Sequence, residues 1–259
     1  MANSRKYATW GGAILGTLLA LLLAVPAFAQ VTQDFHRTVP LSANGDVSLS
    51  NINGDVEITG WDRNEVQIDA VKKARDQQRL DEARIEVENG SDYVRIKTEY
   101  PHHQTNNNPA SVHYQLHVPQ NARLHSISLV NGSLTVQKVS AEVEASLVNG
   151  KARIDDLAGP VDISSVNGAI EANYASLNNV RDIELKSVNG SIELGLPSSP
   201  NAEIKASTVN GGIRTDFPLQ VKGEFVGRRL SGTLGSGGTQ IELSNVNGSI
   251  HIGSGRSSL

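Results

Sequence analysis

The chain has 259 residues, with 23 Lys and Arg against 27 Asp and Glu, and it contains no cysteine. The acidic balance argues against nucleic acid or an anionic membrane surface as a partner, because both attract basic proteins. Without cysteine, disulfides cannot hold the fold together and no lipid anchor can be attached at a processing site.

Residues 1–29 have the layout of a secretory signal peptide. Two basic residues precede a long apolar run that ends in a small-x-small motif, which predicts cleavage between Ala29 and Gln30. The alternative is an uncleaved membrane anchor, since the apolar run is almost long enough to span a bilayer. Cleavage would leave no stable membrane span and would export the protein to the periplasm, the cell surface or the medium.

Residues 30–70 begin the mature chain with alternating strands and Asn-Gly turns. Trp61 follows one of these strands, and we interpret it as a packing lid rather than a ligand platform. Residues 72–84 then predict a short helical insertion, with an amphipathic helix over about 76–84. Stacked coils need covered ends, so this helix is expected to cap the N-terminal end.

Residues 85–118 return to strands, and several histidines lie close together in the sequence: His102, His103, His113, His117 and His125. On one strand, His113 and His117 would lie about 13 Å apart at roughly 3.3 Å per residue. That separation is too large for the two to share a metal ion. We therefore expect no metal site among them.

An Asn-Gly repeat dominates the rest of the mature chain. Apolar or small residues fall six, four and one positions before each Asn, and three and five positions after it, except that Thr215 takes the last place after Asn210. The Asn131 repeat is less regular, since His125 takes its first place. Glycine supplies the backbone freedom that a sharp turn needs, and asparagine tolerates it well. The predicted turn residues are Asn53, Gly54, Asn131, Gly132, Asn149, Gly150, Asn167, Gly168, Asn189, Gly190, Asn210, Gly211, Asn247 and Gly248.

Two architectures explain this repeat. Asn-Gly between alternating runs is a strong β-hairpin signal, which would give a meander or sandwich of hairpins. The spacing between Asn131, Asn149 and Asn167 is uniformly 18 residues, however, which is typical of stacked coils. We therefore predict an all-β, single-stranded parallel β-solenoid over residues 30–252, followed by a flexible tail at 253–259.

The gap of 37 residues between Asn210 and Asn247 is about two coils long. It predicts one coil that has lost its Asn-Gly, with a remnant near Leu230-Ser231-Gly232. The glycine-rich run 232–238 leads into a strand rather than a helix, so turns between coils explain it better than a phosphate-binding loop.

Several of these motifs together resemble a known family. They are the strand Gly54-Asp55-Val56-Glu57-Ile58, the Gly60-Trp61-Asp62 turn, the polar helix, the Val-Asn-Gly series and the late glycine-rich run. In this combination the chain resembles the bacterial β-strand-repeat "putative adhesin" family, a domain of unknown function. The resemblance covers nearly all of the mature chain. It implies a β-solenoid protein of the cell envelope and transfers no catalytic residues.

Stacking in register would place equivalent residues in columns about 4.8 Å apart. Three positions before each Asn this gives a column made mostly of serine, and the asparagines themselves are expected to form an amide ladder. Five positions before the Asn stand Glu144, Asp162 and Glu184, followed by Lys205. Stacked carboxylates repel one another. This column is either a solvated acidic edge or a weak strip for divalent cations.

The coil around Asn247 comes last in the sequence, so it is expected to end the stack. An uncovered coil exposes strand edges, which invites strand addition or self-association. The residues of this candidate association end are Ile241, Leu243, Ile250 and Ile252.

These patterns favour a non-catalytic, exported scaffold that presents a rigid surface to an envelope protein or a glycan and holds no cofactor. An envelope-stress sensory module acting through partner binding is the alternative. A polysaccharide-acting enzyme is less favoured, since its best acid pair, Asp155-Asp156, fits an ordinary turn.

Overall fold

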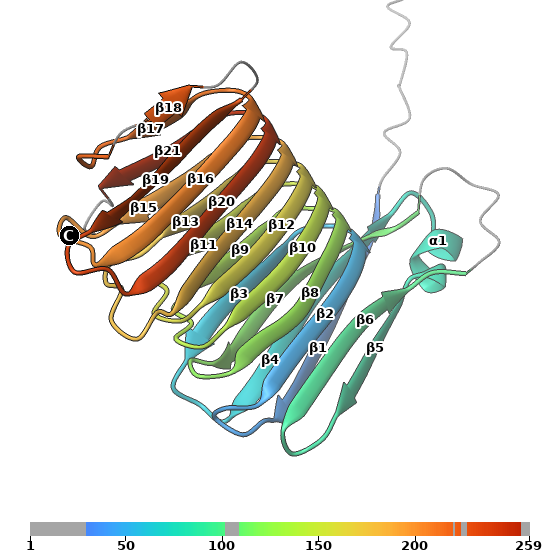
Figure 1. The fold of residues 1–259 in the computed structure, drawn as a ribbon. Helices are drawn as coiled ribbons and strands as arrows, with labels where there is room; N and C mark the ends of the chain where they lie inside the picture. The colour runs from blue at the N-terminus through green and yellow to red at the C-terminus, as the bar shows by residue number, and fades with distance from the viewer. Residues whose placement is uncertain (1–29, 102–108, 220, 224–226, 255–259) are drawn as a thin grey trace, which may run out of the picture.

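The computed structural model describes residues 30–101, 109–219, 221–223 and 227–254. These residues form two large, mostly parallel β-sheets and one short helix (Figure 1). Sheet A has 10 strands in the order β1-β4-β7-β3-β9-β11-β13-β15-β21-β17. Sheet B has 11 strands in the order β18-β19-β16-β20-β14-β12-β10-β8-β2-β6-β5. The predicted signal peptide, His102, His103 and residues 255–259 lie outside the described residues.

Each repeat forms a coil with one strand in sheet B and the next in sheet A, joined at an Asn-Gly corner. The seven coils are β2 (Asp46–Asn53) with β3 (Val56–Trp61), β8 (Arg123–Asn131) with β9 (Leu134–Gln137), β10 (Val143–Asn149) with β11 (Ala152–Asp155), β12 (Val161–Asn167) with β13 (Ile170–Asn173), β14 (Asp182–Asn189) with β15 (Ile192–Leu196), β16 (Ala202–Asn210) with β17 (Ile213–Thr215), and β20 (Thr239–Asn247) with β21 (Ile250–Ser254).

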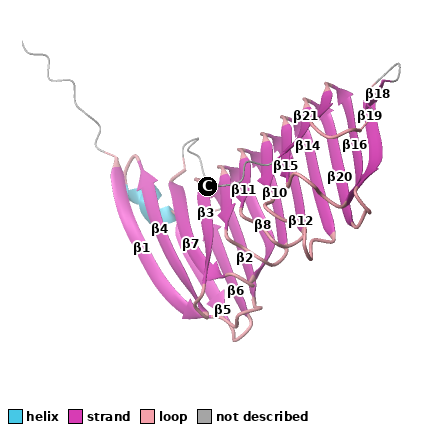
Figure 2. Cartoon of the chain, turned by 90° about the vertical axis from the view of Figure 1, so that its left-hand side faces the viewer, coloured by secondary structure: helices cyan, strands magenta, loops and turns pink. Residues whose placement is uncertain are grey.

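The two strands that flank each Asn-Gly lie in different sheets, so these turns form no hairpins. The all-β class and the parallel stacking are as predicted, and the hairpin meander is wrong. The single-stranded solenoid is not confirmed, because every coil contributes to two separate sheets. Figure 2 shows these coils following one another along the stack.

Neighbouring coils pair in the same register, so identical repeat positions lie side by side. Around Asn167 the residues six and four positions before it, Val161 and Ile163, are buried, as are Ile170 and Ala172 after it. These apolar residues of the two sheets pack on each other and form one continuous core. The core positions were therefore predicted correctly in most repeats, except for His125 and for the position directly before each Asn, both described below.

The predicted irregularity at His125 has a local cause. Strand β8 carries a β-bulge, seen as a register shift against β10 between Val143 and Ala145, and Ser126 there has a φ of 64°. The extra residue moves Leu124 into the first core position of this repeat and leaves His125 exposed. The repeat around Asn131 is therefore irregular, as predicted, and His125 does not enter the core.

Five further strands extend the sheets at the N-terminal end: in each sheet the strand beside the first coil pairs parallel with it, and the outer strands pair antiparallel. Sheet A continues through β7 (Ser111–Pro119), β4 (Glu65–Ala74) and β1 (Val31–Pro40), and sheet B through β6 (Tyr93–Glu99) and β5 (Arg84–Asn89).

The helix α1 (Gln77–Glu82) joins β4 of sheet A to β5 of sheet B at this end of the stack (Figure 1). Asp76 caps its N-terminus, and Leu80 is buried under it. The Nζ atom of Lys72 donates to the carbonyl oxygens of Leu80 and Ala83 at 2.9 Å and satisfies the C-terminal end of the helix. The helix lies where an N-terminal cap requires it, but Lys72 belongs to β4 and the helix is shorter than predicted.

In the C-terminal part of the chain, the order of the strands within the sheets differs from their order in the sequence. After β17, the chain forms β18 (Val221–Gly223) and β19 (Arg228–Leu234), and β19 pairs antiparallel with β16. No degenerate coil lies at Leu230, and the long gap is explained by this antiparallel excursion. The glycine-rich run then turns the chain into β20, as its turn interpretation predicted.

Strand β20 pairs with β14 on one edge and with β16 on the other, and β21 lies likewise between β15 and β17. The coil of Asn247 is thus inside the stack, and its predicted position at the end is wrong. The four residues assigned to an open association end are core residues at most 2% exposed: Ile241, Leu243, Ile250 and Ile252. Strand β21 also extends to Ser254, two residues into the predicted tail.

Candidate binding face

The outward face of sheet B has a regular surface, because equivalent residues of neighbouring coils pair in register. Along each strand, alternate residues point outward, and these are the residues five, three and one positions before the Asn. Register pairing aligns them across the coils into three parallel columns. We call them the acidic column, the serine column and the valine column.

The valine column contains β-branched aliphatic residues, one from each coil, each between 37% and 46% exposed. In spatial order it runs Ile52, Val130, Val148, Val166, Val188, Val246 and Val209. The sequence pattern had placed these residues in the buried set, and this is wrong. A continuous stripe of exposed aliphatic side chains is unusual on a protein surface, which makes this stripe the candidate binding feature of the face.

The residue that directly precedes each valine-column residue in the sequence points inward instead. This position holds Leu129 and Leu147 in two coils but a buried polar residue in the others: Asn51, Ser165, Ser187, Thr208 and Asn245. Several of these reach the neighbouring coil, since Ser187 Oγ donates to the carbonyl oxygen of Gly168 at 3.3 Å. Because these inward residues are polar, the sequence does not show the alternation of buried apolar and exposed polar residues that would have placed the valines outside.

The serine column lies beside the valine column and supplies small, polar side chains. Its members are Ser50, Ser128, Ser146, Ser164, Lys186, Ser244 and Ser207, in spatial order. A shallow groove of about 390 Å³ runs along the two columns over five coils, lined by Ser146, Val148, Val166 and Val188 among others. The small serines leave the aliphatic side chains accessible from the side.

The acidic column lies on the other side of the serine column. Glu144, Asp162 and Glu184 are direct register neighbours on β10, β12 and β14, as predicted. The next neighbour is Glu242 and not Lys205, because the coil of Asn247 intervenes. The column therefore holds four consecutive carboxylates.

Two basic side chains of the described residues pair with carboxylates of this column. His125 Nδ1 lies 2.7 Å from a carboxylate oxygen of Glu144, and Lys186 pairs with Glu184. Partial burial, together with the charges of Glu184 and Glu144, raises the pKa of Asp162, which Lys186 partly offsets. Within the described residues, no three carboxylate or imidazole groups are arranged to hold a metal ion, so the predicted cation strip gains no support.

The asparagines form the predicted amide ladder at the corners. The Nδ2 of every corner asparagine except Asn53 donates to the Oδ1 of a neighbouring corner asparagine at 2.9 to 3.0 Å, so six bonds connect the seven coils. The corner glycines stack very closely, since a Cβ on Gly168 would lie 1.8 Å from the carbonyl oxygen of Gly150. The glycine is needed here for close approach as much as for backbone freedom.

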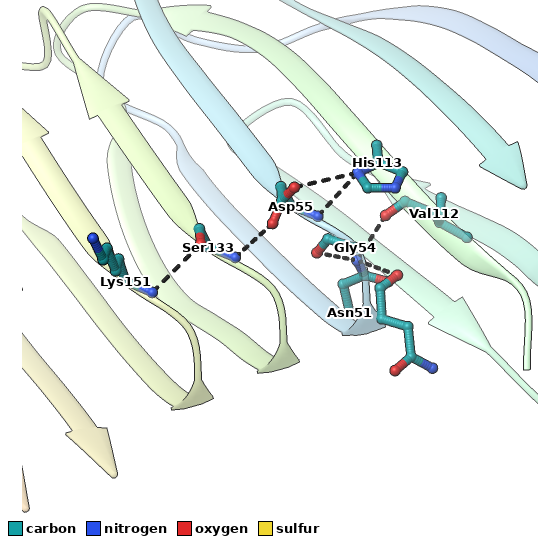
Figure 3. A network of polar contacts seen from close by, with 8 residues as sticks. Asn51, Gly54, Asp55, Val112, His113, Ser133 and Lys151 are labelled. Atoms are coloured by element: carbon teal, nitrogen blue, oxygen red, sulfur yellow. Dashed lines mark hydrogen bonds and ion pairs between the residues drawn. The ribbon is translucent and has the colours of Figure 1, made fainter. Parts of the chain in front are cut away.

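The corner of the first coil has an additional polar network (Figure 3). Asn51 Nδ2 donates to the carbonyl oxygens of Gly54 at 3.1 Å and Val112 at 2.8 Å, which ties this coil to strand β7. Asp55 accepts from the backbone nitrogen of Ser133 at 2.8 Å on the next coil. The network fixes the register at the N-terminal end of the face.

The outward face of sheet A differs from that of sheet B. Arg153 pairs with Asp155 at 2.9 Å and with Glu171 at 3.0 Å, beside a polar groove of about 560 Å³. Asp155 also accepts from Asn173, and Asp156 has a φ of 55°. The Asp155-Asp156 pair is thus a turn in which one carboxylate is engaged by its neighbours.

The described histidines do not converge on one site. His113 lies beside Asp55, and the ring of His117 packs 5.2 Å from that of Trp61. Trp61 Nε1 donates to the carbonyl oxygen of Glu65 at 2.9 Å, and Arg63 lies over its indole ring. Trp61 is therefore a packing lid, as predicted.

Solved structures and one protein family are similar to this chain. A "putative cell adhesion protein" from Clostridium sporogenes is similar at 14% identity over 86% of this chain and 100% of its own, with a TM-score of 0.47. A "putative adhesin" from Bacteroides fragilis is similar at 10% identity over 86% and 97%, with a TM-score of 0.39. No curated protein matches the chain. The sequence model of the Toastrack DUF4097 family matches residues 37–253, and the chain belongs to this family, in agreement with the predicted resemblance.

Proposed function

We propose that this protein is an exported, non-catalytic scaffold of the cell envelope that binds a protein partner through the outward face of sheet B. The valine column carries the proposal, since seven exposed aliphatic side chains in one line have no partner within the described chain. Stable protein interfaces have such an apolar centre with a polar rim.

The acidic column favours a partner that carries positive charge beside its apolar surface. A surface that packs against the valine column also covers the serine column and reaches the four carboxylates beyond it. Basic residues at the matching edge would relieve the repulsion among these carboxylates and speed association. The partner is therefore a protein with an apolar stripe flanked by Lys or Arg.

The test is capture of partners from cell-envelope extract by the full mature chain, residues 30–259. A first variant combines Val166→Glu with Val188→Glu on the binding face. Because both side chains point outward, we expect an unchanged circular dichroism spectrum and a loss of capture. The matched control combines Glu171→Gln with Glu193→Gln, from the same two coils but on sheet A.

A second variant combines Glu144→Gln, Asp162→Asn and Glu184→Gln and tests the charge. We expect it to capture less partner at low salt and to lose most of the salt dependence that the wild type shows. Equal capture by the wild type and the valine variant would overturn the proposal, and so would the absence of any capture by the wild type.

A further inference from the structure

The coil formed by β20 and β21 occupies a slot between two coils that are consecutive in the sequence. Ile183 of β14 and Ile204 of β16 both pair with Ile241 of β20. In sheet A, Ile192 of β15 and Ile213 of β17 both pair with Ile250 of β21. The slot thus offers four strand edges, two in each sheet.

The two walls of the slot also match each other. The residues that face Ile241 and Asn247 from either side occupy the same repeat positions, with Asn189 on one wall and Asn210 on the other. Strands β14 and β16 therefore have the register and the inward residues to pair directly. The chain up to β17 can form a continuous stack before the last coil arrives.

The inserted coil is part of the common core and of the asparagine ladder. Its apolar residues are buried in the common core, and Asn245 Nδ2 donates to the carbonyl oxygen of Gly190 at 2.6 Å. Asn247 connects the asparagine ladder across the slot in both directions. All these contacts are made by residues 239–254 with the slot walls, and an identical segment from another molecule would make the same ones.

One short segment, residues 235–238, joins β19 to this coil. Gly235, Gly237 and Gly238 have φ values of 57°, 75° and 132°, and the Ser236 nitrogen donates to Asn201 Oδ1 at 3.0 Å. The segment crosses the end of β16, which lies between β19 and β20 in sheet B. Short connections of this kind act as hinges in domain swapping.

We propose that residues 239–254 are an exchangeable coil, and that the slot of one molecule accepts the coil of a second copy to form a reciprocal dimer hinged at residues 235–238. Because β14 and β16 can pair directly, the slot walls assemble without residues 239–254, and the last coil enters by separating them. A coil from a neighbouring molecule then competes for the slot in proportion to its concentration. This inference is independent of the binding face on sheet B.

The absence of cysteine permits a direct test by engineered crosslinks. The test variant combines Lys186→Cys with Ser244→Cys, register neighbours on the slot wall and on the inserted coil. The control variant combines Ser146→Cys with Ser164→Cys, register neighbours on two coils outside the slot. Adjacent parallel strands lie about 4.8 Å apart, which suits a disulfide.

Both variants are refolded at a series of protein concentrations, oxidised and run on a denaturing, non-reducing gel. In a swapped dimer the test pair links two chains, whereas the control pair still links two positions of one chain. We expect covalent dimers that increase with concentration for the test variant and covalent monomers throughout for the control. Covalent monomers at every concentration for both variants would overturn the proposal.

A second experiment uses the cysteine-free protein and does not depend on the crosslinks. Deletion of Gly237 and Gly238 leaves two residues between Leu234 and Thr239, which pair with Ala202 from opposite edges of β16. The shortened connection must be almost fully extended to cross β16, so insertion within one molecule is strongly disfavoured. By light scattering, the refolded deletion variant is expected to be dimeric with the circular dichroism spectrum of the wild type. A folded monomeric deletion variant, together with a wild type that stays monomeric when refolded at high concentration, would also overturn the proposal.

Discussion

The side-chain amide of Asn247 donates a 2.9 Å hydrogen bond to the side-chain oxygen of Asn189, 58 residues earlier in the chain. Asn210 follows Asn189 by one repeat in the sequence, yet it bonds to Asn247 instead. The corners are therefore interchangeable in geometry, and their order in space is not their order in the chain. This equivalence makes the ladder a good place to measure how strongly the coils are coupled.

The first prediction concerns this ladder. Asn167→Ala removes the bond that Asn167 donates to Asn149 and the one that it accepts from Asn189. We expect the free energy of unfolding to fall by about 1–2 kcal/mol, since each bond contributes about 0.5–1.5 kcal/mol and both are exposed. Urea denaturation measures the change. Asn121→Ala, an exposed asparagine outside the ladder, is the control, and an equal effect in both variants would contradict a role for the ladder.

The second prediction concerns the stacked glycines. In Gly168→Ala the new methyl group would lie 1.8 Å from the carbonyl oxygen of Gly150, so the corner must shift. We expect a loss of about 1–3 kcal/mol in the free energy of unfolding, as for other overpacked sites.

Gly212→Ala is the matched control for this substitution, since nothing lies within 4 Å of its added Cβ. Both variants are compared by thermal and urea denaturation. If Gly168→Ala is tolerated as well as Gly212→Ala, close approach of the corners does not explain the repeated glycine.

The third prediction concerns two equivalent buried serines. Ser165 Oγ is buried without a hydrogen-bond partner, whereas Ser187 Oγ donates to the carbonyl oxygen of Gly168. Ser165→Ala removes an unsatisfied polar atom, so we expect it to raise the free energy of unfolding by about 1 kcal/mol. Ser187→Ala breaks a bond and is expected to lower it by a similar amount. Shifts of the same sign in the two variants would contradict this explanation.

The repeat made much of the fold predictable from sequence. Period-two alternation located the core residues on both sides of each Asn-Gly, such as Ile163 and Ile170, and the uniform spacing favoured stacked coils over a chain of hairpins. The amide ladder and the acidic column followed from register alone. These features depend on one repeat and its nearest neighbour, which is the information a periodic sequence contains.

Two features of the site were missed for physical reasons. Val166 seemed to belong to the core because it is apolar, whereas the inward position beside it is the polar Ser165. Only strict alternation from Ile163 would have placed Val166 outside. The position of the last coil was hidden because all repeats share one register, so β14 fits β16 and β20 equally well.

The last prediction concerns pH. Partial burial and the charges of Glu184 and Glu144 raise the pKa of Asp162 above its ordinary value of 3.8. The folded state then binds this proton more tightly than the unfolded chain, so the contribution of Asp162 to stability falls as the pH rises past 3.8. Asp162→Asn removes the charge, and we expect it to have a higher melting temperature than the wild type at pH 7. The difference should shrink toward zero as the pH is lowered below 3.8.

Glu193→Gln, on sheet A and outside the column, is the control. A lower melting temperature for Asp162→Asn at pH 7, or a difference that does not change with pH, would show that repulsion within the acidic column does not limit the stability of this face.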